Sequence, residues 1–111
     1  MRTVLYVFAL LMMAGPGQCE TLNGAAITQA LAGHKFAYDD GTSQLFADDG
    51  RTLFFARDSS ESIGHWRVEG DQYCSVWPPS DHWACYDVTQ DGGQIGFVSG
   101  DGSVSLARRA D

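Results

Sequence analysis

Apolar and polar side chains alternate with a period of two in short runs from residue 35 to the end of the chain, and turn-forming residues separate the runs. Short runs with this period are typical of half-buried β-strands, and Asx-Gly turns between them are typical of hairpins. Eight segments follow this pattern: 35–38, 43–47, 52–57, 63–69, 71–77, 82–89, 94–98 and 103–108. They predict an all-β domain, a small antiparallel meander of about eight short strands that is either closed into a barrel or flattened into a sandwich.

A change of period marks one short helix before the first strand. Ile27, Ala30 and Leu31 are spaced to form one apolar stripe on a helix. Asn23 is suited to cap the helix because its side-chain oxygen can accept a backbone N–H, and Gly33 is suited to the left-handed conformation that ends many helices. We therefore expect one short N-terminal helix between Asn23 and Gly33.

Residues 1–19 have the organisation of a secretory signal peptide. Arg2 supplies a positive end, residues 4–13 are apolar without interruption, and small residues follow. The apolar run is too short to cross a bilayer as a helix, which takes about 20 residues. Cleavage is expected after Gly17 or after Cys19, and the two positions stay open. The expected location is periplasmic or secreted, with no membrane span in the mature chain.

Composition supports a single exported domain over residues 20–111. The chain has 111 residues, of which 44% are hydrophobic, and this is enough for one globular core and too little for two. Its net charge of −7 argues against nucleic acids and anionic membranes as partners, because both select a basic surface.

The segment 71–89 is expected to form a disulfide-linked hairpin. In an oxidising compartment Cys74 and Cys85 are expected to pair. A turn over residues 78–81 also places Cys74 opposite Cys85, and Tyr73 opposite Tyr86. The bond would stabilise the domain by roughly 2–3 kcal/mol by the chain-entropy estimate.

The same register sorts the neighbouring side chains into two faces. The expected core face carries Trp66, Val68, Tyr73, Ser75, Trp77, Ala84, Tyr86 and Val88. The expected outer face carries His65, Arg67, Gln72, Val76, Trp83, Asp87 and the disulfide. A slip of one residue would exchange the two faces, because side chains alternate along a strand.

The hairpin resembles a known family. The residues that carry the resemblance are Gly64, Trp66, Val68, Gly70, Asp71, Tyr73-Cys74, Trp77-Pro78-Pro79-Ser80 and Trp83-Ala84-Cys85-Tyr86-Asp87. Through them the chain resembles a group of small exported alphaproteobacterial domains of unknown function, which implies an envelope location but no reaction. Relatives of this kind sometimes carry the name dihydrodipicolinate reductase. The chain has no strand–Gly-x-Gly-x-x-Gly–helix motif for a dinucleotide, so its residues give no support to that activity.

The candidate metal ligands have simpler explanations. His82 lies three residues before Cys85, with Cys74 nearby, which is a conceivable zinc site, but a disulfide uses the same sulfurs and suits the compartment better. Aspartates in the turns 39–41 and 48–50 could suggest calcium, but successive turns of a meander lie at opposite ends. No spacing of serine, histidine and aspartate indicates a catalytic triad. We expect no metal, no cofactor and no enzymatic activity.

One group of residues is a candidate contact patch: Trp77, Pro78, Pro79, His82 and Trp83. Aromatic rings beside prolines are typical of surfaces that bind a protein, a peptide or a small ligand, although the same rings could instead cap the core. The sequence favours a non-catalytic envelope module of unknown ligand, and the alternative is a small enzyme whose site is assembled in space. A filled barrel would favour surface binding, whereas a cavity with a histidine and a carboxylate would favour the enzyme.

Overall fold

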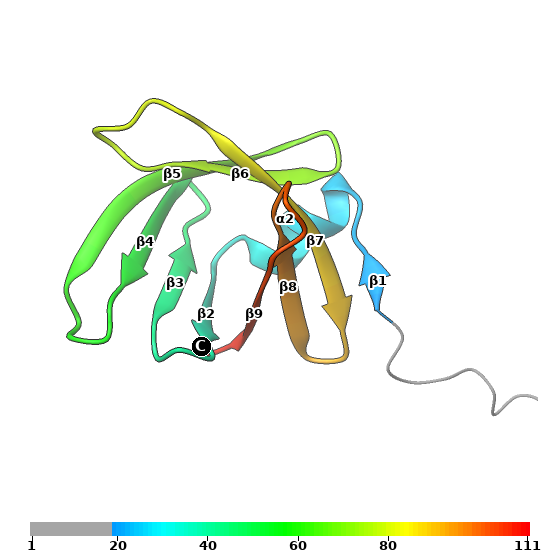
Figure 1. Cartoon of the computed structure of the whole chain (residues 1–111), viewed down its shortest axis with the longest axis horizontal. Helices are drawn as coiled ribbons and strands as arrows, with labels where there is room; N and C mark the ends of the chain where they lie inside the picture. The colour runs from blue at the N-terminus through cyan, green and yellow to red at the C-terminus, as the bar shows by residue number, and fades with distance from the viewer. Residues whose placement is uncertain (1–18) are drawn as a thin grey trace, which may run out of the picture.

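Across residues 19–111, which the computed structural model describes, the chain forms nine strands and one helix (Figure 1). Their bounds are β1 (Glu20–Thr21), α2 (Gly24–Leu31), β2 (His34–Tyr38), β3 (Ser43–Phe46), β4 (Arg51–Phe55), β5 (Glu61–Glu69), β6 (Gln72–Val76), β7 (Ala84–Asp91), β8 (Gln94–Val98) and β9 (Val104–Arg109). The eight predicted strands correspond to β2 through β9. The predicted signal peptide, residues 1–19, lies outside the described residues except for Cys19, which is exposed.

The strands form a meander that closes on itself. From β2 to β9 each strand pairs antiparallel with the next, and β9 pairs with β2 to complete an eight-strand barrel. Of the two architectures that the sequence left open, the structure therefore has the barrel. β1 is a further strand that the sequence did not predict. It pairs with Thr89 and Gln90 of β7, beyond the stretch of β7 that β6 reaches.

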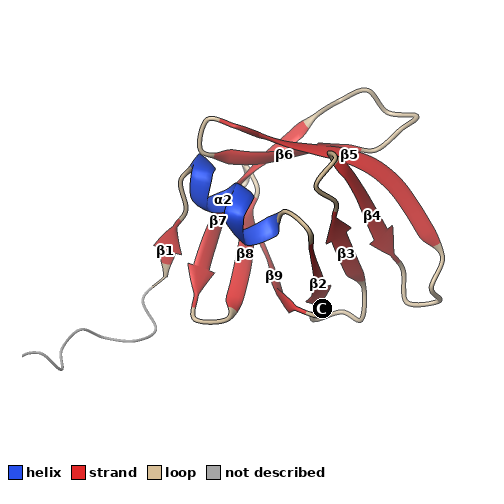
Figure 2. Ribbon diagram, turned by 180° about the vertical axis from the view of Figure 1, so that it is seen from behind, coloured by secondary structure: helices blue, strands red, loops and turns tan. Residues whose placement is uncertain are grey.

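The helix α2 closes one end of the barrel (Figure 2). It contacts β2, β5 and β6, and its Ile27 and Leu31 are fully buried. Asn23 caps the helix as predicted, by accepting a backbone hydrogen bond of 2.9 Å. After the helix, the Gly33 N–H donates to the Phe46 carbonyl at the end of β3, over 2.7 Å. These contacts fix α2 across the end of the barrel where β3 finishes and β4 begins.

The core is built from inward-facing side chains and from the inner face of α2. Its members are Leu22, Ile27, Leu31, Phe36, Phe46, Trp66, Tyr73, Val88, Ile95, Phe97 and Ala107. Phe46 contacts three of these rings edge-on, with centroid distances of 5.9 Å to Phe36, 5.6 Å to Trp66 and 5.6 Å to Tyr73. Burying such large rings supplies most of the stability of a small domain.

The β6–β7 hairpin has the predicted register. Cys74 lies opposite Cys85 and Tyr73 opposite Tyr86. The tight turn, however, covers residues 77–80, because the Ser80 N–H donates to the Trp77 carbonyl over 3.1 Å. The prediction of a turn over 78–81 is wrong by one residue. The two prolines have no N–H, so Ser80 is the first residue after them that can close a turn.

The two faces of the hairpin are also as predicted, but the outer face is more covered than expected. Trp66, Tyr73 and Val88 face the core. On the outer face, Cys74 and Val76 are buried as well, at 0% and 6% exposure. An aromatic–guanidinium stack accounts for this: Arg67 of β5 reaches Trp83, before β7, at 3.8 Å from ring centroid to guanidinium carbon. Because β6 lies between β5 and β7, this stack crosses over the outward side chains of β6.

Candidate functional site

The end of the barrel opposite α2 holds a cavity of about 590 Å³. Aromatic rings make much of its wall: Tyr38, Phe54, Tyr73, Trp77, Tyr86 and Phe97. Small hydroxyl side chains lie between the rings: Thr42, Ser62, Ser75 and Ser105. Gln44 also lines it, and Asp40 is the one ionisable carboxylate among the described lining residues. An apolar hollow with a few polar groups is the usual form of a small-molecule site.

The cavity exists because inward positions differ in size between the two ends. At the α2 end, the inward side chains of β3 and β5 are Phe46 and Trp66, which fill the barrel. At the open end, β5, β6 and β9 have small side chains at inward positions, namely Ser62, Ser75 and Ser105. In a small barrel the size of the interior side chains decides whether it is filled or holds a ligand. All eight barrel strands run through both halves, but side chains fill the barrel only in the half nearest α2.

Gly64 allows Trp77 to form part of the cavity wall. A Cβ atom at Gly64 would lie 2.7 Å from the Trp77 ring and 2.6 Å from the Val76 carbonyl oxygen, closer than real Cβ contacts allow. The indole therefore lies flat against β5 in the space that a side chain would occupy. Phe54 meets it edge-on, with the two ring centroids 6.4 Å apart.

A buried hydrogen-bond network forms the polar part of the wall. The Tyr38 hydroxyl donates to Gln44 Oε1 over 2.7 Å. Gln44 Nε2 donates to Thr52 Oγ1 and to the Tyr73 hydroxyl oxygen, over 2.9 and 3.2 Å. Thr52 in turn donates to the Leu45 carbonyl over 2.8 Å. Gln44 is only 5% exposed, so these bonds satisfy a polar group that would be costly to bury alone.

The charge state of the site follows from burial and from hydrogen bonding. Burial raises the pKa of Tyr38 far above its ordinary value, and it also raises the pKa of Tyr73. Both phenols therefore stay neutral at physiological pH. Asp40 is exposed, and hydrogen bonds from the Thr42 hydroxyl and backbone N–H lower the pKa of its carboxyl group. The cavity thus combines a neutral wall with an ionised carboxylate at its mouth.

The structure divides the residues of the candidate contact patch between two places. Trp77 and Pro78 line the cavity. Trp83 is half-buried on the outside of the barrel, where it stacks on Arg67. Pro79 and His82 are exposed, Pro79 within the turn over residues 77–80 and His82 in the loop after it. The patch is therefore not one surface, and its inward part belongs to the cavity.

Cys74 and Cys85 form the predicted disulfide, so their sulfurs are not available as metal ligands. Cys74 and Cys85 are joined by an S–S bond of 2.06 Å. The Glu69 carboxylate and the two sulfurs lie within 4.8 Å of one another. Because the sulfurs are bonded to each other, neither is a thiolate that could bind a metal. The zinc hypothesis with His82 therefore lacks its two sulfur ligands.

A histidine beside a carboxylate in the cavity would favour the catalytic alternative. Among the residues that the structure describes, no histidine lines it. His34 instead lies near the α2 end, where its Nδ1 is 3.0 Å from Asp111 Oδ2. Sequence reasoning missed Tyr38, Gln44 and Phe54 as site residues. The small inward residues on β5, β6 and β9 were the available signal of a hollow.

The chain was also compared with known proteins and searched for membrane spans. Within residues 19–111, no helix has the length and apolar character needed to cross a membrane. Comparisons with protein-family models, with curated proteins and with solved structures found no match.

Proposed function

We propose that the protein is an exported, non-catalytic binding module whose barrel cavity holds a small and largely apolar ligand. The observation that carries this proposal is the asymmetry of the barrel, which α2 closes at one end while the other end leads into a cavity of about 590 Å³. Small-molecule sites range over roughly 300–1,000 Å³, and closed eight-strand barrels are wide enough to hold one small ligand. The six aromatic rings offer apolar surface to such a ligand.

The chemistry of the lining favours binding over catalysis. The buried phenols and the Gln44 amide are engaged with one another, so they are poorly placed to exchange protons with a substrate. The lowered pKa of Asp40 makes its carboxylate a weak general base. These features support a site that orients and retains a molecule without transforming it.

The proposed location is the periplasm or the outside of the cell. The signal-peptide pattern of residues 1–19 supports it. The disulfide is also in keeping with an oxidising compartment. In this location the protein would collect a small ligand from the envelope or deliver it there.

Binding of a neutral apolar probe tests the proposal. We expect N-phenyl-1-naphthylamine to bind the purified mature protein with a rise in its fluorescence. Ser105→Trp, which places a large ring in the mouth of the cavity, should weaken binding at least about tenfold by removing the apolar area that the probe buries. Val104→Trp is the matched control, since Val104 is 52% exposed and does not line the cavity.

Two results would contradict the proposal. One is a wild-type protein that does not enhance the fluorescence of the probe. The other is equal weakening by both tryptophan variants, because this would place the probe outside the barrel. Circular dichroism of each variant establishes that the barrel is intact when binding is measured.

A further inference from the structure

The mouth of the cavity is surrounded by turns of predominantly negative charge. Strand order places four connections at this end: residues 39–42, 56–60, 77–83 and 99–103. Their ionisable acidic residues are Asp39, Asp40, Asp58, Asp81 and Asp101. In these same four connections Arg57 is the one arginine or lysine, and its Nε donates to the Asp40 carbonyl over 2.6 Å. A low-dielectric opening lined by one sign of charge attracts ligands of the opposite sign.

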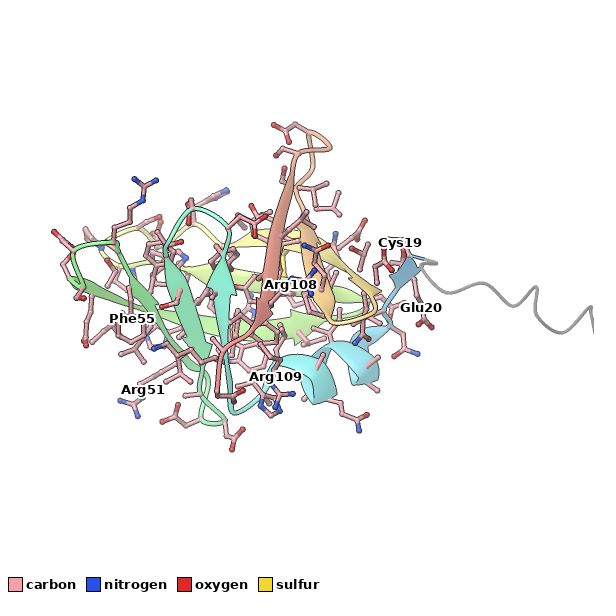
Figure 3. All side chains as sticks on the ribbon, turned by 90° about the horizontal axis from the view of Figure 1, so that it is seen from below. Cys19, Glu20, Arg51, Phe55, Arg108 and Arg109 are labelled. Atoms are coloured by element: carbon pink, nitrogen blue, oxygen red, sulfur yellow. A yellow bond between two sulfur atoms is a disulfide. The ribbon has the colours of Figure 1, made fainter. Side chains whose placement is uncertain are left out.

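Most basic side chains of the barrel lie at its other end or on its outer face. Figure 3 shows Arg51 and Arg109 on the same side of the barrel as α2. Arg51 is the first residue of β4 and Arg109 is the last residue of β9, so both lie at the strand ends nearest the helix. Arg67 stacks on Trp83 outside the barrel. The α2 end carries acidic side chains as well, but Asp49 and Asp111 there form ion pairs with Arg51 and Arg109, so part of its negative charge is neutralised.

The wall of the cavity suits a cation and offers no partner to an anion. Tyr38 lies 6.5 Å from Phe54 and 6.2 Å from Phe97, measured between ring centroids. Tyr73 continues this series of rings, at 5.3 Å from Phe97. The faces of aromatic rings attract ammonium groups, and several rings together form the known type of cage for quaternary ammonium ions. No lysine, arginine or histidine lines the cavity in the described part of the chain, so a buried anionic group would have no counter-charge.

Asp40 joins these two features, because it belongs to the acidic turns and also lines the cavity. Its Oδ1 accepts hydrogen bonds from the Thr42 N–H and hydroxyl, over 3.0 and 2.6 Å, and these fix the carboxylate in its turn. A held carboxylate beside aromatic rings provides a fixed negative charge at the entrance.

From this arrangement we infer that the ligand is a small organic cation, an amine or quaternary ammonium compound with an apolar part. The charged group lies among the rings near Asp40, and the apolar part occupies the space beyond them. This inference rests on the proposed function, since it names the class of ligand for the same cavity.

Three phenols of nearly equal shape test the charge of the ligand. The probes are 4-hydroxyphenyltrimethylammonium, 4-tert-butylphenol and 4-hydroxybenzenesulfonate, which differ in a para group that is positive, neutral or negative. Isothermal titration calorimetry at low salt measures the affinity of each probe. We expect the cation to bind at least about tenfold more tightly than the neutral probe, and the sulfonate not to bind measurably. Added salt should weaken binding of the cation more than binding of the neutral phenol.

A pair of matched variants tests the role of Asp40. Asp40 and Asp49 occupy the same position in two Asp-Asp-Gly turns at opposite ends of the barrel, and each accepts a backbone N–H from the residue two positions later. Asp40→Asn should weaken binding of the cation about fivefold and leave binding of the neutral phenol unchanged. Asp49→Asn makes the same change of net charge and should alter neither.

The outcomes separate this inference from the proposed function. Equal affinity for the cation and the neutral phenol would overturn the inference and leave the ligand-binding barrel in place. Tighter binding of the sulfonate would do the same. Failure of all three phenols and of the naphthylamine probe to bind would overturn both. Equal effects of Asp40→Asn and Asp49→Asn on the cation would show that Asp40 is not the entrance charge.

Discussion

The two ends of this barrel are made by the same strands, yet they are packed in different ways. At the α2 end, Ile27, Leu31 and Phe46 are fully buried, and the rings around Phe46 meet edge-on. At the open end, Tyr38 and Trp77 are half-buried and border an empty space. The filled end supplies most of the buried contacts of the fold, and the hollow end is the site of the proposed ligand.

The difference between the two ends is tested most strongly by removing a large side chain from the packed core at the α2 end. Trp66 packs on Phe46, and its Nε1 donates to the Ala47 carbonyl over 2.9 Å. Trp66→Ala should cost on the order of 3–5 kcal/mol, because it removes a large buried ring and leaves a void. Urea denaturation gives the value from the shift of the midpoint at constant slope.

Trp83→Ala is the counterpart on the outer face. It loses the stack on Arg67 and some cover over the outer face of β6, so it should cost clearly less than Trp66→Ala. The same denaturation series compares the two. Equal losses would mean that the outer stack is as important to stability as the core.

The disulfide should affect stability without distinguishing the two ends. It links β6 to β7 across a sequence separation of 11 residues. The double variant Cys74→Ala/Cys85→Ala should lose roughly 2–3 kcal/mol by the chain-entropy estimate. Binding of the neutral naphthylamine probe should survive wherever the variant remains folded. A wild-type protein whose urea midpoint is unchanged by a strong reductant would argue against this contribution.

Gly64→Ala should act on the open end. The new methyl group would overlap the Trp77 ring and the Val76 carbonyl, so the indole must move. We expect a loss of about 1–3 kcal/mol, the usual range for overpacking, because the ring can move into the cavity but the Val76 carbonyl belongs to the backbone of β6. Binding of the cationic probe should fall with it. Gly100→Ala is the control, since its methyl group would meet open space, and a similar loss there would contradict the role given to Gly64.

The smallest expected effect concerns a turn at the open end. Hydrogen bonds from Ser99 and Ser103 lower the pKa of Asp101 from its ordinary value of 3.8 to about 2. Because the folded state holds the ionised form, this stabilisation is complete above the unfolded pKa and is lost as the pH falls through the folded pKa. Asp101→Asn should therefore lose less stability than wild type between pH 5 and about pH 2, a window that follows from linkage. The free energy of unfolding of both proteins, measured over this pH range, checks the prediction. Equal losses in wild type and Asp101→Asn would contradict it.

Local sequence signals specified the strands but not the hollow. The period of two placed β2 to β9, and the facing of Cys74 and Cys85 was derived from the hairpin alone. β1 escaped notice because two residues are too few to show a period. The cavity depends on side chains from all eight barrel strands and on the pairing of β2 with β9, which no local pattern encodes. Trp77 was expected both on the core face and in a contact patch, and the structure places it in the cavity wall.

The pairing of β2 with β9 has a consequence for when the site comes into being. Phe36 lies opposite Arg109, so the seam of the barrel joins residues near the two ends of the described chain. Contacts between positions so distant in sequence form late, because the intervening chain must first be confined. A chain in which β9 has not yet paired with β2 has no closed barrel and therefore lacks the enclosed cavity. The proposed ligand would therefore find an enclosed site only after the seam between β2 and β9 has closed, so binding depends on one of the longest-range contacts of the fold.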